Sequence, residues 1–412
     1  MVSARRWPAV LPAIVAMGVA ACTAATPPPS GPSASPEPTP GSSPGASATS
    51  APGPTSSAIV PEIGGDLRDE IEVVSIDPDL THPILEFRSD GQAIVFSSGR
   101  EPDTGPDGAP DLWRIVPPGA EPELLWRNPE RNHSIVGIAA DLGSYAFVEM
   151  PLTGERAWNL WLLPRGAESA ILLDTHPGNE AVPSAVPSIA VHESTVVWTA
   201  FDRGPDGPVS QLRIAQGPDW EQRVIHELPA AEAEIWLPSL LGSTLAYMEV
   251  HYRDGRSTDE RHVFLTGIEP GAERRRLDGS GLATMPVVVD GAVLWKEADP
   301  GFSMFNWGRM YRYDLATETV RRLRTSPQQF VNYPSAGSRF AAWWGSDSFQ
   351  LGVYDLLLYE PRLVARHPIA SQQSELEPHV AGDLLVWRHA DLLDPDDPGE
   401  LRYAFLPPLR EP

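Results

Sequence analysis

The sequence predicts an all-β fold, a seven-bladed β-propeller with four strands in each blade. A short hydrophobic run that closes on an aromatic residue recurs seven times along the chain, at spacings of 44 to 51 residues. Strand-like runs and turn residues follow each copy. Repeats of this length with several short strands are typical of propellers, whose blades must stack to bury both faces of each sheet. The seven aromatic residues are Phe96, Phe147, Trp198, Tyr247, Trp295, Trp343 and Trp387.

The repeat assigns four strands to each blade in a fixed order. Five repeats carry a proline nine to eleven residues before the aromatic residue, and we place this proline at the start of the first strand. The aromatic run is the second strand, a run such as "DLWRIV" is the third, and a run such as "ELLW" is the fourth. Alternation along the second strand puts Val197 and Trp198 on opposite faces, so we expect the aromatic side chains to pack between blades. The five prolines are Pro187, Pro238, Pro286, Pro334 and Pro378.

The ring is expected to close through the N-terminal part of the chain. The last repeat, which ends in "LRYAFLPPLREP", has a third strand but no clear fourth one. A β-branched run, "IEVVSI" at residues 71–76, precedes the first repeat and has no place in it. An N-terminal strand that completes the seventh blade is the simplest closure, because it removes an open sheet edge.

The N-terminus predicts export and lipid anchoring. Residues 1–21 read as a signal peptide, with Arg5 and Arg6 before an apolar stretch too short to span a bilayer. The segment "VAAC" before and at Cys22 resembles the bacterial lipoprotein signal, which implies lipid on Cys22 and stable attachment to the cell membrane through two or more acyl chains. The alternative is an ordinary signal peptide with a chance cysteine. Both Sec and twin-arginine export stay open, as do the inner and outer membranes.

Residues 22–62 are predicted to be a disordered linker and residues 63–412 the propeller. The linker consists mainly of Pro, Ser, Ala, Thr and Gly, which cannot bury enough apolar surface to fold. Cys22 is the only cysteine of the chain, so no intramolecular disulfide forms and stability must come from core burial.

The charge of the chain excludes some partners. The net charge is −24 at pH 7, and Lys296 is the only lysine. Nucleic-acid binding needs clustered Lys and Arg, so we expect no nucleic-acid partner. An acidic surface also disfavours lying flat on an anionic membrane, but it suits an exported domain that binds cations. We expect a monomer.

Two segments resemble a known family. "RSDGQAIVFSS" with "DLWRIV", and "PVVVDGAVLW" with "MYRYDLATETVRRL", are similar to TolB-type and related WD40-like propeller repeats of bacterial exported proteins. The resemblance covers residues 70 to 407 and implies the propeller fold, but that fold carries many functions. We expect neither the N-terminal partner domain of TolB nor a fused peptidase domain, so TolB's own role is not carried over.

Metal-ion and cofactor signals are weak. The histidines are scattered, and no pair has metal-ligand spacing. Two aspartate-rich loops are the only candidates for Ca²⁺ or another divalent cation, and solvated hairpins built on Asp, Gly and Pro explain them better. No cofactor is therefore expected. The loop residues are Asp103, Asp107 and Asp111 in one, and Asp391, Asp394, Asp396 and Asp397 in the other.

A ligand is expected at the mouth of the central channel, where loops enter the first strands. Acids and aromatic residues gather there, which suits a cationic or sugar ligand, although a solvated polar rim is the alternative. The candidate residues are His133, Glu234, Trp236, Asn332, Tyr333, Glu375 and Glu377.

Two classes of function remain open. The first is a non-enzymatic, membrane-anchored binding or scaffold module at the cell envelope, with a protein or an envelope glycan as its partner. The alternative is a propeller enzyme, a glycosidase, lactonase or lyase, with acidic residues or a metal at the channel mouth. No catalytic residue is assigned. Carboxylates that converge at the mouth would favour the enzyme.

Overall fold

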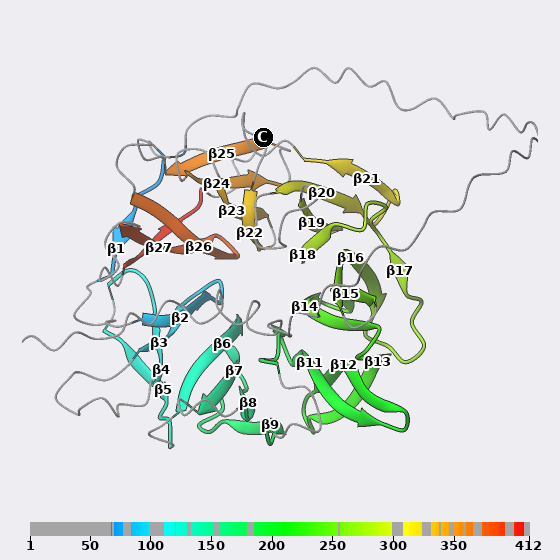
Figure 1. Ribbon diagram of the computed structural model, residues 1–412. Coiled ribbons are helices and arrows are strands. Elements are labelled where there is room, and N and C mark those ends of the chain that lie inside the picture. Colours follow the sequence, from blue (N-terminus) through cyan, green and yellow to red (C-terminus); the bar gives the residue numbers. More distant parts are fainter. Residues whose placement is uncertain are drawn as a thin grey trace, which may run out of the picture. The chain divides into compact units, whose positions relative to one another are not determined.

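The computed structural model confirms the seven-bladed propeller: strands β1 to β28 form seven four-stranded blades in a ring (Figure 1). No helix long and apolar enough to cross a membrane occurs among the described residues. The signal peptide, Cys22 and the linker lie outside them. The described residues are 67, 70–76, 84–98, 111–119, 121–129, 133–151, 156–178, 185–253, 256–298, 308–323, 331–337, 339–345, 350–356, 360–365, 373–391 and 399–407.

Each blade is an antiparallel sheet whose strands follow one another from the channel outwards. Blade 1 comprises β2 (Ile84–Ser89), β3 (Ile94–Ser98), β4 (Asp111–Ile115) and β5 (Glu123–Trp126). Blade 2 comprises β6 (His133–Asp141), β7 (Ser144–Pro151), β8 (Trp158–Leu163) and β9 (Ile171–His176). Blade 3 comprises β10 (Ile189–His192), β11 (Thr195–Gly204), β12 (Gly207–Gln216) and β13 (Glu221–Pro229). Blade 4 comprises β14 (Ala233–Leu241), β15 (Thr244–Arg253), β16 (Arg256–Gly267) and β17 (Arg275–Arg276).

The remaining blades follow the same plan. Blade 5 comprises β18 (Ala283–Val289), β19 (Ala292–Ala298), β20 (Gly308–Asp314) and β21 (Thr319–Arg322). Blade 6 comprises β22 (Val331–Ala336), β23 (Phe340–Gly345), β24 (Gln350–Asp355) and β25 (Glu360–Ala365). Blade 7 comprises β26 (Gln373–Ala381), β27 (Leu384–Asp391), β28 (Glu400–Phe405) and β1 (Val74–Ser75). Blades 5 and 6 are also joined by one pairing between β20 and β22.

The predicted closure is confirmed. β1 pairs with β28 in antiparallel register, with Val74 opposite Tyr403 and Ser75 opposite Arg402. The backbone N–H of Ile76 then donates to the carbonyl of Leu401 at 2.9 Å. The N-terminal segment therefore supplies the fourth strand of the last blade, although the paired strand is shorter than the run at 71–76.

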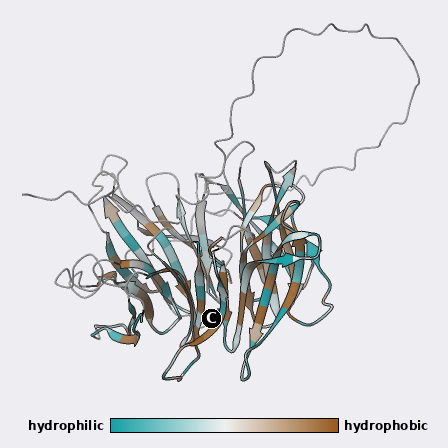
Figure 2. Ribbon diagram, turned by 60° about the horizontal axis from the view of Figure 1, so that its bottom comes forward, coloured by the Kyte–Doolittle hydropathy of each residue, from teal (hydrophilic) through white to brown (hydrophobic). Residues whose placement is uncertain are grey.

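The aromatic residues of the second strands form the cores between blades, as predicted. Each of the seven is at most 2% exposed. Trp198, for example, packs in a cluster that joins blades 2 and 3, and Trp387 packs in one that joins blades 6 and 7. Hydrophobic and hydrophilic stretches alternate along the strands (Figure 2), in keeping with sheets whose buried faces meet neighbouring blades.

The placement of the repeat proline at the start of the first strand is wrong for most blades. In β14, Leu237 and Pro238 form a bulge, because the register moves from Trp236 opposite Met248 to Ser239 opposite Ala246. The bulge leaves two residues facing one aromatic, Tyr247. The same register shift surrounds Pro286, Pro334 and Pro378, whereas Pro187 precedes β10. Proline has no N–H to give to a ladder, so a bulge inside the strand is a position where it fits.

A serine directly after the bulge links one innermost strand to the next. The Oγ of Ser239 accepts a hydrogen bond of 2.9 Å from the backbone N–H of Val288 in blade 5. The Oγ of Ser335 accepts one of 2.8 Å from the N–H of Val380 in blade 7. The Pro–Ser pairs of the sequence thus fix the spacing of neighbouring first strands around the channel.

Removing residues 71–76 should destabilise the whole propeller. The deletion leaves blade 7 without its fourth strand and removes the buried side chain of Ile76, so we expect the free energy of unfolding to fall by at least about 3 kcal/mol. Thermal unfolding followed by circular dichroism measures the change. Deletion of residues 40–45 in the linker is the control, and equal melting temperatures for the two deletions would contradict the closure.

Candidate functional site

The candidate site lies at the end of the ring where the chain enters the first strand of each blade. Consecutive innermost strands contact one another around the ring, and β2 and β26 complete the circuit. Because first and second strands are antiparallel, the beginning of β14 and the end of β15 lie at this same end. Side chains at this end of the first strands are those that we predicted to line the mouth of the central channel.

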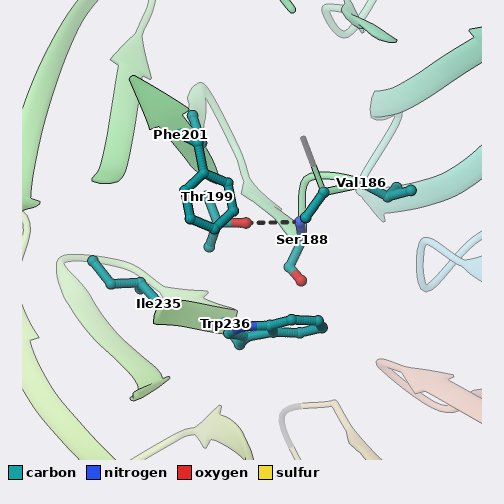
Figure 3. Close-up of a pocket in the computed structure, with 8 residues that line it drawn as sticks. Val186, Ser188, Thr199, Phe201, Ile235 and Trp236 are labelled. Atoms are coloured by element: carbon teal, nitrogen blue, oxygen red, sulfur yellow. Dashed lines mark hydrogen bonds between the residues drawn. The ribbon is translucent and has the colours of Figure 1, made fainter. Parts of the chain in front are cut away.

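Trp236 forms one side of a shallow pocket between blades 3 and 4. Figure 3 shows its indole on one side of the gap, with Ser188, Thr199 and Phe201 on the other. The backbone N–H of Ser188 donates to the Oγ1 of Thr199 at 3.0 Å and so fixes that wall. The pocket encloses about 250 Å³ with the open solvent at its mouth included, and its enclosed part has room for about one water molecule. A small-molecule site is normally larger.

Glu234 holds the indole of Trp236 in place. The Nε1–H of Trp236 donates to the Oε2 of Glu234 at 3.0 Å, which is the contact expected between residues two apart on one face of a strand. Burial raises the pKa of Glu234, and hydrogen bonds from Trp236 and Tyr252 partly offset the rise. The structure therefore brings together these two predicted residues, with the carboxylate positioning the aromatic ring.

Two other predicted residues make contacts elsewhere. Glu377 lies in the bulge of β26 with a φ of 51°, and its carboxylate lies 3.8 Å from Arg388. The Nδ1 of His133 lies 3.1 Å from the Oε1 of Glu149, a carboxylate that is 1% exposed and also accepts from the Nε1–H of Trp161 at 2.9 Å. His133 thus belongs to a buried network within blade 2.

The remaining predicted residues cannot be assembled into a site. Asn332 and Tyr333 lie on β22 and Glu375 on β26, and their side chains lie outside the described part of the structure. The same holds for the side chain of Asp391 on β27. Asp103, Asp107, Asp394, Asp396 and Asp397 lie outside the described residues altogether.

Asp111 has a structural contact. It is buried, and its Oδ1 accepts a hydrogen bond of 2.9 Å from the backbone N–H of Asn128. In the described part of the chain, no three His, Cys, Asp or Glu side chains are grouped so as to hold a metal ion.

A charged cluster at the contact of blades 1 and 7 was missed by the sequence analysis. Arg88 lies with its Nη1 3.0 Å from the Nε2 of His379 and 3.6 Å from the Oε2 of Glu86. Burial raises the pKa of Glu86; Arg88 and Arg388 lower it and the nearby Glu377 raises it, and the net result is a pKa of about 7. The signal that pointed here is a pair of charges, Glu86 and Arg88, within a first strand. We call these five residues the seam cluster.

A second missed cluster joins blades 3 and 4. The buried carboxylate of Glu249 lies 3.2 Å from the Nε2 of His226 and 3.3 Å from that of His251, and it also pairs with Arg274. The ring of His251 lies 5.2 Å from that of His262, whose nitrogens contact two further carboxylates. Histidines that are scattered in the sequence are thus gathered by the fold. A glutamate two residues after the repeat aromatic, as at Tyr247, was the available signal.

The single lysine of the chain is buried at the same end of the ring. Lys296 is 0% exposed on β19, opposite Thr284 of β18. Burial, with a smaller contribution from Arg261, lowers the pKa of Lys296 to about 7. The amine is therefore only partly charged at neutral pH.

Replacing Lys296 with methionine should remove a pH dependence of stability. The pKa is about 10.5 in the unfolded chain and about 7 in the fold, so the unfolded state binds more protons between these values. Wild-type stability should then rise by about 3 kcal/mol from pH 7 to pH 9.5, and Lys296→Met should lack this rise. Urea unfolding at both pH values measures the free energy of unfolding. The same increase between pH 7 and pH 9.5 in wild type and Lys296→Met would refute the lowered pKa of Lys296.

Comparisons with known proteins support the fold alone. No family model matches the chain, and neither does any curated protein. The propeller domain of the Trilobed protease from Pyrococcus furiosus is 10% identical, with a TM-score of 0.55, and the match covers 78% of this chain and 92% of that one. Oligogalacturonate lyase from Vibrio parahaemolyticus is 14% identical with a TM-score of 0.55, covering 84% and 96%.

TolB from Acinetobacter baumannii is also among the matching structures, at 12% identity, a TM-score of 0.37 and coverage of 77% and 64%. A TM-score this low does not support a specific similarity to TolB. The Pyrococcus propeller is described as having an open velcro topology, whereas here β1 pairs with β28. The chain is thus a β-propeller, similar in fold to propellers of enzymes, and fold does not settle its activity.

Proposed function

We propose that this chain is an exported β-propeller, anchored to the cell membrane through lipid on Cys22, that works as a non-enzymatic binding module at the cell envelope. The observation that carries the proposal is the fixed indole of Trp236 at the channel mouth. Its Nε1–H is held by Glu234, so the ring keeps one orientation without a partner. A preoriented aromatic side chain loses little conformational entropy on binding.

The size of the pocket at Trp236 supports a macromolecular partner. Room for about one water molecule is too little for a small ligand, but a shallow depression beside an aromatic side chain suits an extended surface. Tryptophan is enriched among the residues that contribute most to binding, and its ring also stacks on sugars. The partner class is a protein or an envelope glycan, and the net charge of −24 disfavours nucleic acid.

Trp236→Ala should weaken binding to the cell envelope strongly. The Cys22→Ser protein, which lacks the lipid site, is mixed with envelope preparations, and the bound fraction is measured by sedimentation. Loss of a central tryptophan costs about 2 kcal/mol or more, so we expect the affinity to fall at least about 30-fold. Separate purified protein and glycan fractions identify the partner class.

Phe405→Ala is the matched control, because Phe405 is an exposed aromatic residue on blade 7, 46% exposed. This variant should bind like the parent protein. Binding that is absent in the parent, or unchanged in Trp236→Ala, would rule out the proposed surface.

Cys22→Ser should release the full chain from the membrane. Without the thiol no thioether lipid forms, and one cysteine offers no substitute site. Fractionation of cells and intact-mass measurement compare the two proteins. A variant that stays in the membrane fraction, together with a wild type that carries no lipid mass, would contradict lipid anchoring.

The second candidate function is a propeller enzyme with acidic residues in the channel. The pKa of about 7 at Glu86, close to Glu377, favours it, because a carboxyl group that titrates near neutral pH suits general acid–base catalysis. A panel of polysaccharides and lactones, with product detection by chromatography, tests it. Turnover that disappears in Glu86→Gln supports the enzyme, and no turnover with any compound leaves the binding module as the better account.

A further inference from the structure

The pocket at Trp236 encloses a space that suits an apolar group of about the size of a methyl. Its enclosed part has room for about one water molecule. A buried water molecule needs about two to four polar partners, and most of the side chains that line this pocket are apolar. A methyl group is therefore a better occupant than water. The apolar lining residues are Ala185, Val186, Ala200, Phe201 and Ile235.

A flat face of the Trp236 indole is turned toward the same space. Figure 3 shows the ring nearly edge-on, with Ser188 and Thr199 across the gap. Glu234 accepts from the Nε1–H at 3.0 Å and is itself hydrogen-bonded by Tyr252 of β15, so the ring is held in this orientation. The face of an aromatic ring carries negative charge density, which attracts the C–H groups of a sugar ring.

Ser188 adds a polar group beside the apolar space. Its backbone N–H donates to the Oγ1 of Thr199 at 3.0 Å, which fixes the residue, and Figure 3 shows its Oγ turned toward the gap above Trp236. A hydroxyl group both donates and accepts hydrogen bonds. A ligand group that joins an amide to a methyl, as an acetamido group does, matches this combination.

We propose that the pocket receives the acetamido methyl group of an N-acetylated sugar, whose ring lies on the indole of Trp236. The inference rests on the proposed function and names the partner as a glycan rather than a protein. A sugar is favoured because the methyl group and the ring face belong to one rigid unit, so little conformational entropy is lost on binding.

The charges at the site favour a neutral glycan. The net charge of the chain is −24, which disfavours a polyanion. The carboxylate of Glu234 accepts hydrogen bonds from Trp236 and Tyr252, so it serves to position the ring and not to pair with a cation. The ligand class is thus an uncharged glycan that contains N-acetylated sugars.

Triacetylchitotriose and cellotriose are the probes, because they differ only in the acetamido or hydroxyl group at C2 of each sugar. Titration calorimetry on the full-length Cys22→Ser chain measures the affinity for each. Burial of one methyl group and one added hydrogen bond should make triacetylchitotriose bind at least about tenfold more tightly than cellotriose. Equal affinities would refute the acetamido pocket.

Ala185→Val separates the pocket from the ring. The larger side chain fills the pocket from the segment before β10 and leaves the indole bonded to Glu234, so the preference for triacetylchitotriose should fall to within about twofold. Trp236→Ala should weaken the binding of both trisaccharides. Ala167→Val, in the exposed turn between β8 and β9, is the matched control and should keep the wild-type preference. An unchanged preference in a folded Ala185→Val protein would overturn the proposal.

Competition separates this proposal from the proposed function, and it uses no pocket variant. Triacetylchitotriose should displace the parent Cys22→Ser chain from envelope preparations, and cellotriose at the same concentration should displace much less. Envelope binding that needs Trp236 but persists in saturating triacetylchitotriose would refute the N-acetylated glycan and leave the proposed function with a protein partner. A parent chain that does not bind the envelope at all would overturn both.

Discussion

Closure of the ring is the constraint on which the rest of this structure depends. Seven sheets form a channel only if the first and last blades meet, and here the link is short: two residues of β1 pair with β28. Packing reinforces it, because Leu67 is fully buried in the cluster of blades 6 and 7, and Ile76 is buried in the cluster of blades 7 and 1. The chain segment next to the linker thus becomes part of the core.

The channel-facing features follow from that closure. Packing between blades uses clusters of buried side chains around the aromatic residue of each second strand, and the first strands contribute apolar residues such as Ile235 and Val380 while still carrying polar residues. The bulges add to this freedom, because they let a first strand turn locally at Leu237 or Glu377 without losing its pairing on either side. The Trp236 surface and the seam cluster both lie on such strands, at opposite sides of the ring.

Periodic packing made the fold predictable from the sequence. The spacing of residues such as Trp198 and Trp295 gave the number of blades, and the unassigned run at 71–76 gave the closure, because both follow from burying every sheet face. The prolines were misplaced, since spacing alone does not distinguish the start of a strand from a bulge within it. Of the seven predicted channel-mouth residues, the structure brings Glu234 and Trp236 into contact, because they are neighbours on one strand.

The clusters could not be predicted, because they join residues that are far apart in the chain. Arg88 meets His379 only after the ring has closed, and His226 meets Glu249 across two blades. The local sequence marks one side of each cluster, the charge pair of Glu86 and Arg88 and the glutamate after Tyr247, but it does not mark the residues that they contact. Burial also shifts the pKa values of ionisable side chains, as it does for Lys296. Burial of a charged side chain is a property of the assembled ring and is not visible in the local sequence.

Amide hydrogen exchange at β1 is the most direct measurement of the closure. The account predicts that the amide of Ile76, bonded to Leu401, is exchanged only through global opening, with the same free energy as core amides of β11 such as that of Trp198. Fast exchange at Ile76, while Trp198 stays protected, would show that the ring holds without its N-terminal strand and would contradict the account.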